Sequence, residues 1–263
     1  MTTTATATST GSSSDADTPL RSLPASYSAT RDALQRVATH VLARRRHALS
    51  GTFGLRATPR GFGTPASGPE HEVVRVAGTR LVRETTGTTA ATRSLDLAGA
   101  TLRQAAELVG VDLDAPFEAG HDTPPLGAGE TPLAIDPVAA LALAEWFAFG
   151  WEVLDDVLAA LEPCADPTVI QIWPEHFDVG VDVAAAPGRR VNLGVSPGDS
   201  FSDQPYIYVG PWDVDRPSDS EYWNAPFGAV LTYDHLRVAH DAAATGRAFL
   251  LRGVDLLGEG AGA

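Results

Sequence analysis

Residues 169 to 183 are predicted to form a β-strand, and from position 176 onward apolar and polar side chains alternate with the period of two that is typical of a strand with one buried and one polar face. Pro174 interrupts the pattern, and we expect it to mark a bulge or an edge position within a single strand. From position 176 onward the odd positions are apolar and the even positions are mostly polar. The odd positions are Phe177, Val179, Val181 and Val183, and the even positions are His176, Asp178, Gly180 and Asp182.

Three further strands are predicted after this one, and the first two repeat the alternation. Their predicted bounds are 189–196, 205–211 and 227–233. In the first two, valine, leucine and isoleucine occupy one face, so the remaining side chains define a second polar row. That row contains Arg190, Asn192, Gly194, Ser196, Tyr206, Tyr208 and Trp212.

The short connection 184–188 predicts an antiparallel hairpin between the first two of these strands. The register we expect places Asp182 opposite Arg190 and His176 opposite Ser196. A slip of one residue would expose the valines and bury the His and Asp side chains. The polar residues of all these strands are therefore expected to share one face of a sheet.

Two helices are predicted in the first half of the chain. Apolar residues recur at helical spacing over 28–50, and Gly51 follows as a stop signal. A second, short helix opens with the capping-box pattern of Thr101 and Gln104 and ends at Gly110.

Two more helices are predicted in the second half. Asp136 and Pro137 form a strong start signal for a helix over 136–162, and Pro163 blocks its continuation. This helix is apolar nearly all round, so we expect it to be buried. A closing helix is predicted from Asp234 to about Leu251.

These elements predict an α+β protein with a mainly antiparallel sheet, packed against the long helix and the C-terminal helix. Four parts of the chain are distinguished by composition. They are a disordered tail over 1–27, an N-terminal α+β half over 28–110, a Pro- and Gly-rich linker over 111–135, and a C-terminal α+β half over 136–263 that carries the candidate site.

Composition excludes several classes of chemistry. All nineteen basic residues are Arg, so no Lys exists for a Schiff base or a P-loop. The single Cys164 excludes an intramolecular disulfide and CxxC sites, and no HExxH pattern occurs. Residues 1–110 carry thirteen Arg and eight acids, a net +5, whereas residues 111–263 carry six Arg and twenty-five acids, a net −19. We expect no nucleic-acid partner for this acidic chain, and attraction between its two halves.

The N-terminal segment lacks the basic and apolar regions of a signal peptide. The most apolar window contains Glu145 and Glu152 and falls short of a membrane span. A cytoplasmic protein without a membrane partner, cofactor or metal is therefore expected, and its oligomeric state stays open.

The predicted polar face is the candidate site, because its glycines permit close approach and its aromatic residues carry polar groups. A face covered by the protein's own loops is the competing interpretation. The candidate ligand-binding residues are His176, Asp178, Asn192, Ser196, Asp199, Tyr206, Tyr208, Trp173, Trp212 and Trp223. No catalytic residue is assigned among them.

Two local motifs would indicate a different kind of site, a hydrolase nucleophile or a metal centre. Gly194 to Gly198 matches the G-x-S-x-G nucleophile elbow, but Pro197 lacks the backbone N–H that the oxyanion requires. His176 and Asp178 have the spacing for two metal ligands on one strand face, but a second His partner is missing. A structural hydrogen bond of His176 with Asp178 or with a serine is the favoured interpretation, and acid–base chemistry by His176 together with Asp178 is the alternative.

Several segments resemble a group of uncharacterised proteins from actinobacteria. They are WPEHFDVGVDV, VNLGVSPGD, PYIYVGPW, WNAPFGAVLTY and GLRATPRGFGTP. The C-terminal half is also similar to a broader bacterial family of unknown function, in which a strand ends in Phe-Asp before a hairpin. Neither resemblance implies an activity, a ligand or a catalytic residue.

Three hypotheses for the function follow. The leading one is a protein that binds a small polar ligand on the polar face, with His176 and Asp178 as anchors. The second is an enzyme that uses His176 as general acid or base. The third is a protein-interaction module whose aromatic loops form the binding patch.

Overall fold

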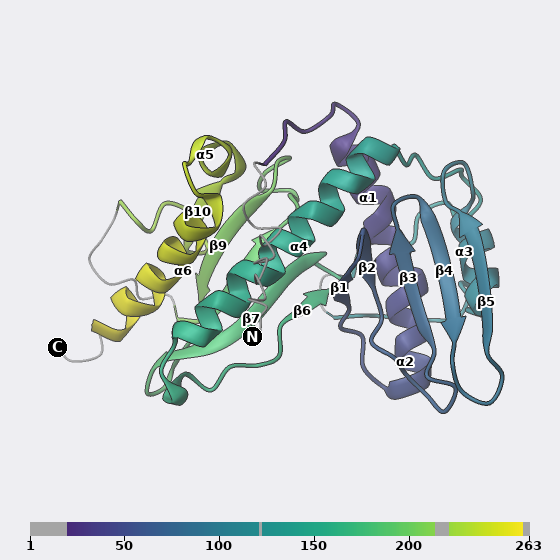
Figure 1. The fold of residues 1–263 in the computed structure, drawn as a ribbon, viewed down its shortest axis with the longest axis horizontal. Helices are drawn as coiled ribbons and strands as arrows, with labels where there is room; N and C mark the ends of the chain where they lie inside the picture. The colour runs from purple at the N-terminus through teal and green to yellow at the C-terminus, as the bar shows by residue number, and fades with distance from the viewer. Residues whose placement is uncertain (1–19, 121–122, 214–220, 260–263) are drawn as a thin grey trace, which may run out of the picture.

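The computed structural model describes residues 20–120, 123–213 and 221–259 (Figure 1). Most of the predicted tail, residues 1–19, lies outside the described residues. The described part of the tail is anchored: Arg21 forms an ion pair with Glu145 at 2.5 Å, and the Tyr233 hydroxyl donates to the carbonyl of Arg21 at 2.8 Å.

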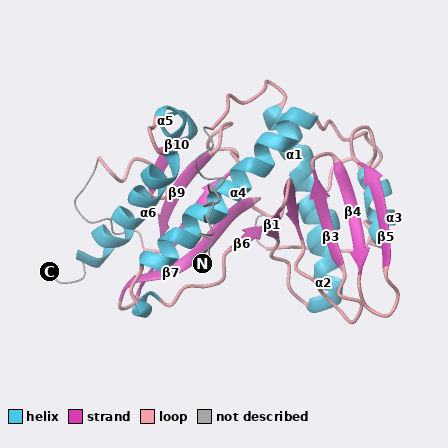
Figure 2. Ribbon diagram, in the orientation of Figure 1, coloured by secondary structure: helices cyan, strands magenta, loops and turns pink. Residues whose placement is uncertain are grey.

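Two five-stranded antiparallel sheets form the protein, each a meander in sequence order. The first sheet comprises β1 (Arg56–Thr58), β2 (Gly61–Gly63), β3 (Val73–Ala77), β4 (Arg80–Thr85) and β5 (Ala91–Asp96). The second comprises β6 (Gln171–Trp173), β7 (Asp178–Ala186), β8 (Arg189–Ser196), β9 (Tyr206–Pro211) and β10 (Ala229–Thr232). Figure 2 shows the two sheets side by side, with β1 and β6 at their facing edges.

The helices lie before and after each group of strands. They are α1 (Tyr27–Val37), the π-helical segment η2 (Ala38–Ala43), α2 (Arg44–Ser50), α3 (Leu102–Val109), α4 (Pro137–Ala160), the 3-10 turn η3 (Pro163–Ala165), α5 (Tyr233–Val238) and α6 (Ala242–Glu259). The predicted α+β class is confirmed, with antiparallel sheets, a long buried helix and a C-terminal helix that contacts it.

The helix boundaries follow the capping residues. Asp136 accepts hydrogen bonds from the backbone of residues 138 and 139 at the start of α4. Thr101 and Gln104 form the predicted capping box before α3. Gly51 and Gly110 adopt the left-handed conformation that ends a helix without a Cβ clash. The helix signals in this sequence are therefore local and strong.

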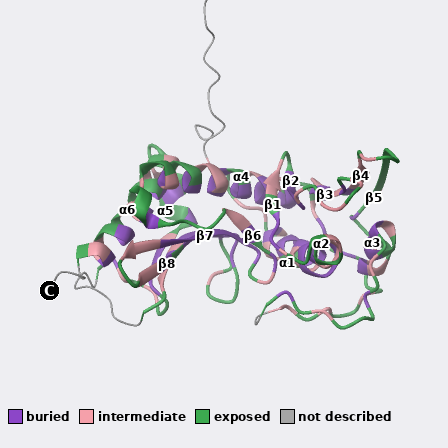
Figure 3. Ribbon diagram, turned by 90° about the horizontal axis from the view of Figure 1, so that it is seen from below, coloured by how far each residue is buried: buried purple, intermediate pink, exposed green. Residues whose placement is uncertain are grey.

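The long helix α4 joins the two sheets. It contacts β1 and β2 of the first sheet as well as β7 and β8 of the second. The edges of the sheets also meet directly, because Leu55 and Ile172 exchange backbone hydrogen bonds of 2.8 Å in each direction. In Figure 3, α4 and α6 lie above the second sheet, whereas α1 and α2 lie below the first sheet.

The second sheet buries the valines and leucine of its apolar face. The odd positions from 179 to 183 in β7 and from 191 to 195 in β8, and the isoleucine and valine of β9, are shielded from solvent. Glycines allow α4 and α6 to pack closely on this face: a Cβ on Gly150 would lie 2.8 Å from Val195, and one on Gly253 would lie 2.8 Å from Val209. The side-chain alternation read from the sequence therefore holds for this sheet.

The stretch containing Pro174 is a hairpin rather than one bulged strand. β6 pairs with β7 in antiparallel register, with Trp173 opposite Asp178, and residues 174–177 form the turn. Phe177 closes the turn in the left-handed conformation at φ 59° and donates its N–H to the carbonyl of Trp173 at 2.6 Å. The prediction of a single strand was wrong because the turn ends on a Phe, a residue seldom found at positive φ.

The predicted register of β7 and β8 is shifted by two residues. Asp182 lies opposite Asn192 rather than Arg190, and the ladder is irregular between Ala184 and Ala186. A shift of two preserves the face of every side chain. His176 lies in the turn and therefore faces no residue of β8.

The predicted C-terminal helix is two helices. α5 ends at Val238, and α6 begins at Ala242 after a break in which Asp241 accepts a hydrogen bond from the N–H of Ala244 at 2.8 Å. The capping carboxylate explains the restart of the helix.

By length and composition α4 could span a membrane, and it is the one helix among the described residues of which this is true. Core helices of soluble proteins meet the same criteria. Within the most apolar window of α4, 61% of the residues are buried by the rest of the protein.

Candidate functional site

The outer face of the second sheet is the face opposite α4 and α6. Here we call "outer face" the even-numbered positions of β7 and β8 together with their neighbours in β6 and β9. The structure brings six of the predicted site residues together on it, as adjacent positions in the strand registers. They are Trp173, Asp178, Asn192, Ser196, Tyr206 and Tyr208.

Two glycines lie at the centre of the outer face, and aromatic rings cover both. Gly180 pairs directly with Gly194. A Cβ on Gly194 would lie 2.3 Å from the ring of Tyr208, and one on Gly180 would lie 3.4 Å from the indole of Trp173. The glycines therefore make room for the protein's own aromatic side chains.

A carboxylate is buried beside these rings. Asp178 is 6% exposed, and its Oδ2 accepts a hydrogen bond from the hydroxyl of Tyr208. Its Oδ1 has no hydrogen-bond partner among the described residues. Burial raises the pKa of Asp178, and the Tyr208 hydrogen bond and the charge of His176 offset only part of this rise.

A second tyrosine–carboxylate pair lies two residues away along β9. The hydroxyl of Tyr206 donates to Oδ2 of Asp199 at 2.6 Å. Burial raises the pKa of Tyr206, and Asp199 raises it further. Asp199 itself sits in a tight turn, where its Oδ1 accepts the N–H of Phe201 at 2.8 Å. The structure thus places Asp199 at the margin of the outer face.

Exposed aromatic side chains follow the same face. Phe201 packs against Tyr206 with ring centroids 5.6 Å apart, and Phe227 packs against Phe201 at 5.0 Å and against Tyr208 at 6.4 Å. Four of these side chains keep a large part of their surface in solvent. They are Trp173 (38% exposed), Phe201 (47%), Trp212 (65%) and Phe227 (37%), and we call this set the aromatic rim.

The remaining predicted residues take different positions. His176 is exposed in the β6–β7 turn. Trp212 reaches the outer face, where its indole N–H donates to Oδ1 of Asn192 at 3.4 Å. Trp223 packs edge-to-face on Tyr222 beside β10, with ring centroids 4.8 Å apart.

The predicted pairing of Asp182 with Arg190 is present, although the register differs. The guanidinium of Arg190 contacts both Asp182 and Asp166. Because Arg190 lies diagonally across the ladder from Asp182, its long side chain spans the shift. This ion-pair group closes one end of the outer face.

The outer face offers more hydrogen-bond acceptors than donors. Both tyrosine hydroxyls donate their hydrogens to the carboxylates of Asp178 and Asp199, so neither has a hydrogen left to donate to a ligand. The carboxylates accept, and the exposed rings present electron-rich faces. This arrangement suits a group that is rich in donors and positively charged.

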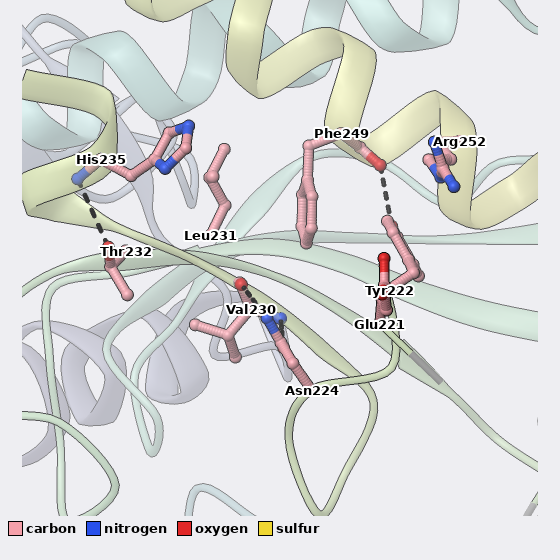
Figure 4. Close-up of a pocket in the computed structure, with 9 residues that line it drawn as sticks. All are labelled: Glu221, Tyr222, Asn224, Val230, Leu231, Thr232, His235, Phe249 and Arg252. Atoms are coloured by element: carbon pink, nitrogen blue, oxygen red, sulfur yellow. Dashed lines mark hydrogen bonds between the residues drawn. The ribbon is translucent and has the colours of Figure 1, made fainter. Parts of the chain in front are cut away.

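The protein has cavities of about 400 to 750 Å³, and none of the five that we describe is lined by Asp178, Tyr206 or Tyr208. The cavity of about 750 Å³ touches only the end of the outer face, at Arg190 and Trp212. Figure 4 shows one of about 420 Å³ between β10, α5 and α6. Its polar groups are partly engaged, since the amide of Asn224 bonds both the N–H and the carbonyl of Val230, and Tyr222 donates to the carbonyl of Phe249 at 2.8 Å.

Two residues of the aromatic rim, Phe201 and Phe227, were missed from the sequence. Both lie in loops, where the period-two pattern gives no face. The signal that could have found them is composition, because Phe227 stands between Pro226 and Gly228 in a loop rich in aromatic residues.

Fold and site together define an α+β protein with an acidic, aromatic open sheet face. Comparison with known proteins found no match: no family model, no curated protein and no solved structure is similar to the chain. Among the described residues, no three His, Cys, Asp or Glu side chains gather closely enough to hold a metal ion.

Proposed function

We propose that the protein is a binding module whose outer face recognises a positively charged segment of a protein partner. The observation that carries the proposal is the aromatic rim, four large side chains that stay exposed along one sheet face. Exposed apolar surface of this kind, bordered by polar groups, is typical of interaction sites.

The charge of the partner follows from the chemistry of the face. Guanidinium and ammonium groups bind over aromatic rings and donate hydrogen bonds to carboxylates. Asp199 is exposed beside Phe201, and the half of the chain that forms this face carries a net charge of −19. Such a field attracts basic segments and raises their rate of association.

The size of the partner follows from the shape of the face. Sites for small molecules are normally concave and bury most of the ligand. Here the rings of Trp173 and Tyr208 fill the space above the central glycines, and none of the five cavities is lined by Asp178, Tyr206 or Tyr208. An extended chain with alternating basic side chains can lie across such a surface without a pocket.

The test is calorimetric titration with a heptapeptide that alternates glycine and arginine, against the same peptide with glutamate in place of arginine. We expect the arginine peptide to bind and the glutamate peptide not to bind. Phe227→Ser and Asp199→Asn should each weaken binding roughly fivefold, the effect of about 1 kcal/mol from one cation–π or charged contact.

Matched controls separate recognition from general attraction to an acidic protein. Val238 is 75% exposed on α5, and Asp155 is exposed on α4, both away from the outer face. Val238→Ser and Asp155→Asn should leave the dissociation constant unchanged. Equal affinity of the arginine peptide for wild type and for Phe227→Ser would contradict the proposal.

A small positively charged ligand is the second candidate, because Asp178 is buried with one unpartnered oxygen. Small-molecule sites use such preorganised polar groups to fix the orientation of a ligand. Thermal-shift measurements with tetramethylammonium and agmatine test this candidate. A shift that is lost in Asp178→Asn supports it, and a shift that is retained in this variant removes its basis.

A further inference from the structure

A cavity of about 490 Å³ lies on the solvent side of α4, between this helix and the β1–β2 hairpin. The hairpin residues Arg56 to Arg60 form one wall, and Tyr233 of α5 and the described end of the tail close it. Its volume falls within the range of about 300 to 1,000 Å³ that is usual for small-ligand sites. The outer face lies on the side of the second sheet that is turned away from α4, so this cavity is separate from the proposed recognition surface.

The wall formed by α4 combines an apolar stripe with the carboxylates of Glu145 and Glu152. Leu141, Ala148 and Trp151 line it at helical spacing, with Phe149 behind them. Leu141 and Trp151 are half-buried and Ala148 is exposed, so this stripe is in contact with the cavity rather than sealed in the core. An apolar body of a ligand can bury this surface from water.

The opposite wall presents two arginines. Arg56 and Arg60 are exposed, and neither guanidinium has a hydrogen bond or ion pair with any residue in the described part of the chain. Other arginines in the described residues hold carboxylates, as Arg45 and Arg83 hold Glu72. Unlike these arginines, Arg56 and Arg60 leave two guanidiniums at one cavity without a carboxylate partner among the described residues.

The backbone holds one of these arginines in an uncommon conformation. Pro59 and Arg60 form the two-residue turn between Thr58 and Gly61, and Arg60 has φ 65°. This position of such a turn normally carries Gly or Asn. In the same hairpin the Thr58 hydroxyl is buried and has no hydrogen-bond partner among the described residues. Strained positions and unsatisfied polar groups of this kind cluster at ligand sites.

The local charge opposes the charge of the whole chain. Three arginines (Arg21, Arg56 and Arg60) and two glutamates (Glu145 and Glu152) line the cavity, a net +1, whereas the chain carries −14. Arg21 already neutralises Glu145 at 2.5 Å. Arg56 and Arg60 therefore give the lining of the cavity its excess of positive charge.

We infer that this cavity binds a small amphipathic anion, with an alkyl or aryl body against α4 and a carboxylate or phosphate between Arg56 and Arg60. The planar fork of a guanidinium matches both oxyanions with two parallel hydrogen bonds. The apolar stripe of α4 supplies the contact area that a simple inorganic anion would not use. This inference does not depend on the function proposed for the outer face.

The test uses decanoate as the probe, below its micellar concentration, with tryptophan fluorescence as the readout because Trp146 and Trp151 line the cavity. We expect saturable binding of decanoate and of decyl phosphate, and at least about tenfold weaker binding of decanol and decyltrimethylammonium, since both lack the anionic group. Decanol binding as tightly as decanoate would overturn the inference.

Arg60→Gly is the most informative variant, because glycine suits the positive φ of this turn and the fold is retained. We expect it to weaken decanoate binding about tenfold, the effect of one charge-assisted bidentate contact. Ala148→Glu should abolish binding by placing a charge on the apolar wall. Arg247→Gln, at an exposed arginine of α6, is the control and should bind as wild type does. Unchanged binding by Arg60→Gly contradicts the inference.

Discussion

The hydrogen bond between Tyr208 and Asp178 is the feature of the outer face that can be tested most sharply. Tyr208→Phe removes only the hydroxyl and keeps the ring over Gly194. In the variant both oxygens of Asp178 are left without a side-chain partner, because Oδ1 has none in the wild type. The substitution therefore isolates one buried carboxyl group.

The expected magnitude depends on the protonation state of Asp178. When the carboxyl is protonated, the loss is that of a neutral hydrogen bond, about 1 kcal/mol in the free energy of unfolding. When it is ionised, the variant leaves a buried charge without its donor, and the loss rises to about 3 kcal/mol. The destabilisation caused by Tyr208→Phe should thus grow as pH rises.

The wild type should show the corresponding trend. Burial raises the pKa of Asp178 above its value in the unfolded chain. The native state therefore binds this proton more tightly than the unfolded state does, and stability from this group is present at low pH and is lost as pH rises through the raised pKa. His176 and Asp199 are the other charged groups that act on Asp178.

The assay is urea unfolding of the wild type and Tyr208→Phe, followed by tryptophan fluorescence at about pH 4.5 and about pH 8. Tyr222→Phe is the matched control, because Tyr222 donates to the backbone carbonyl of Phe249, which does not titrate. Its destabilisation should be about 1 kcal/mol at both values. An equal effect of Tyr208→Phe at the two pH values would refute the assignment of a buried, titrating Asp178.

Two further substitutions test the packing and charge of each sheet. Gly194→Ala places a Cβ 2.3 Å from the ring of Tyr208, so we expect about 1 to 3 kcal/mol of destabilisation by urea unfolding. Glu72→Gln affects the first sheet, where Glu72 is 3% exposed and holds both Arg45 and Arg83. Leaving two half-buried guanidiniums without their anion should cost about 3 kcal/mol. Burial alone would raise the pKa of Glu72, but the hydrogen bonds and charges of Arg45 and Arg83 lower it overall. The stabilisation of the fold by ionised Glu72 is therefore present above the pKa of the unfolded chain, and it is lost as the pH falls through the lower pKa of the native state.

Each of these has a control on the same sheet. A Cβ on Gly210 would make only an ordinary contact with Tyr208 at 3.8 Å, so Gly210→Ala should change stability by less than half as much as Gly194→Ala. Glu84 pairs with Arg75 near the surface, and Glu84→Gln should have an effect below about 1 kcal/mol. Equal destabilisation by Gly194→Ala and Gly210→Ala would contradict the packing argument, and equal destabilisation by Glu72→Gln and Glu84→Gln would contradict the charge argument.

The faces of the second sheet were predictable from the sequence because side-chain alternation survives errors in register. The shift of two residues between β7 and β8 moved Asp182 from Arg190 to Asn192 but moved no side chain to the other face. Arg190 still reaches Asp182, because a long side chain tolerates a diagonal position.

The turn at 174–177 was not predictable in the same way. Phe177 is apolar, so it continues the pattern of the valines, and in the structure it is indeed buried, against Phe62 and Phe147 at 5.1 Å. Its backbone nevertheless adopts a left-handed turn conformation, which tertiary packing rather than local preference imposes. The period of apolar residues indicates which side chains are buried, and Phe177 is buried as the period predicts. The period does not indicate that the chain reverses direction at residues 174–177.

The aromatic rim and the cavity on α4 could not be predicted from the sequence, for a different reason. Phe201 and Phe227 meet across 26 positions of sequence, and the arginines of the β1–β2 hairpin face a helix that begins some 80 residues later. Patterns within a segment give the face of a side chain, but not its partners across the fold. Which residues share the polar face of the sheet could therefore be predicted from the sequence, while the open shape of this face could not.

The central claim is that the outer face recognises positively charged groups. The most direct measurement is an NMR titration of the five tryptophan indole N–H signals with the glycine–arginine peptide. Trp173 and Trp212 are exposed on the outer face, whereas Trp146 is buried on the opposite side of the sheet and donates to the carbonyl of Ser196 at 2.8 Å. We predict that the signals of Trp173 and Trp212 shift while that of Trp146 does not. Shifts confined to Trp146 and Trp151, or no shift at all, would contradict the account.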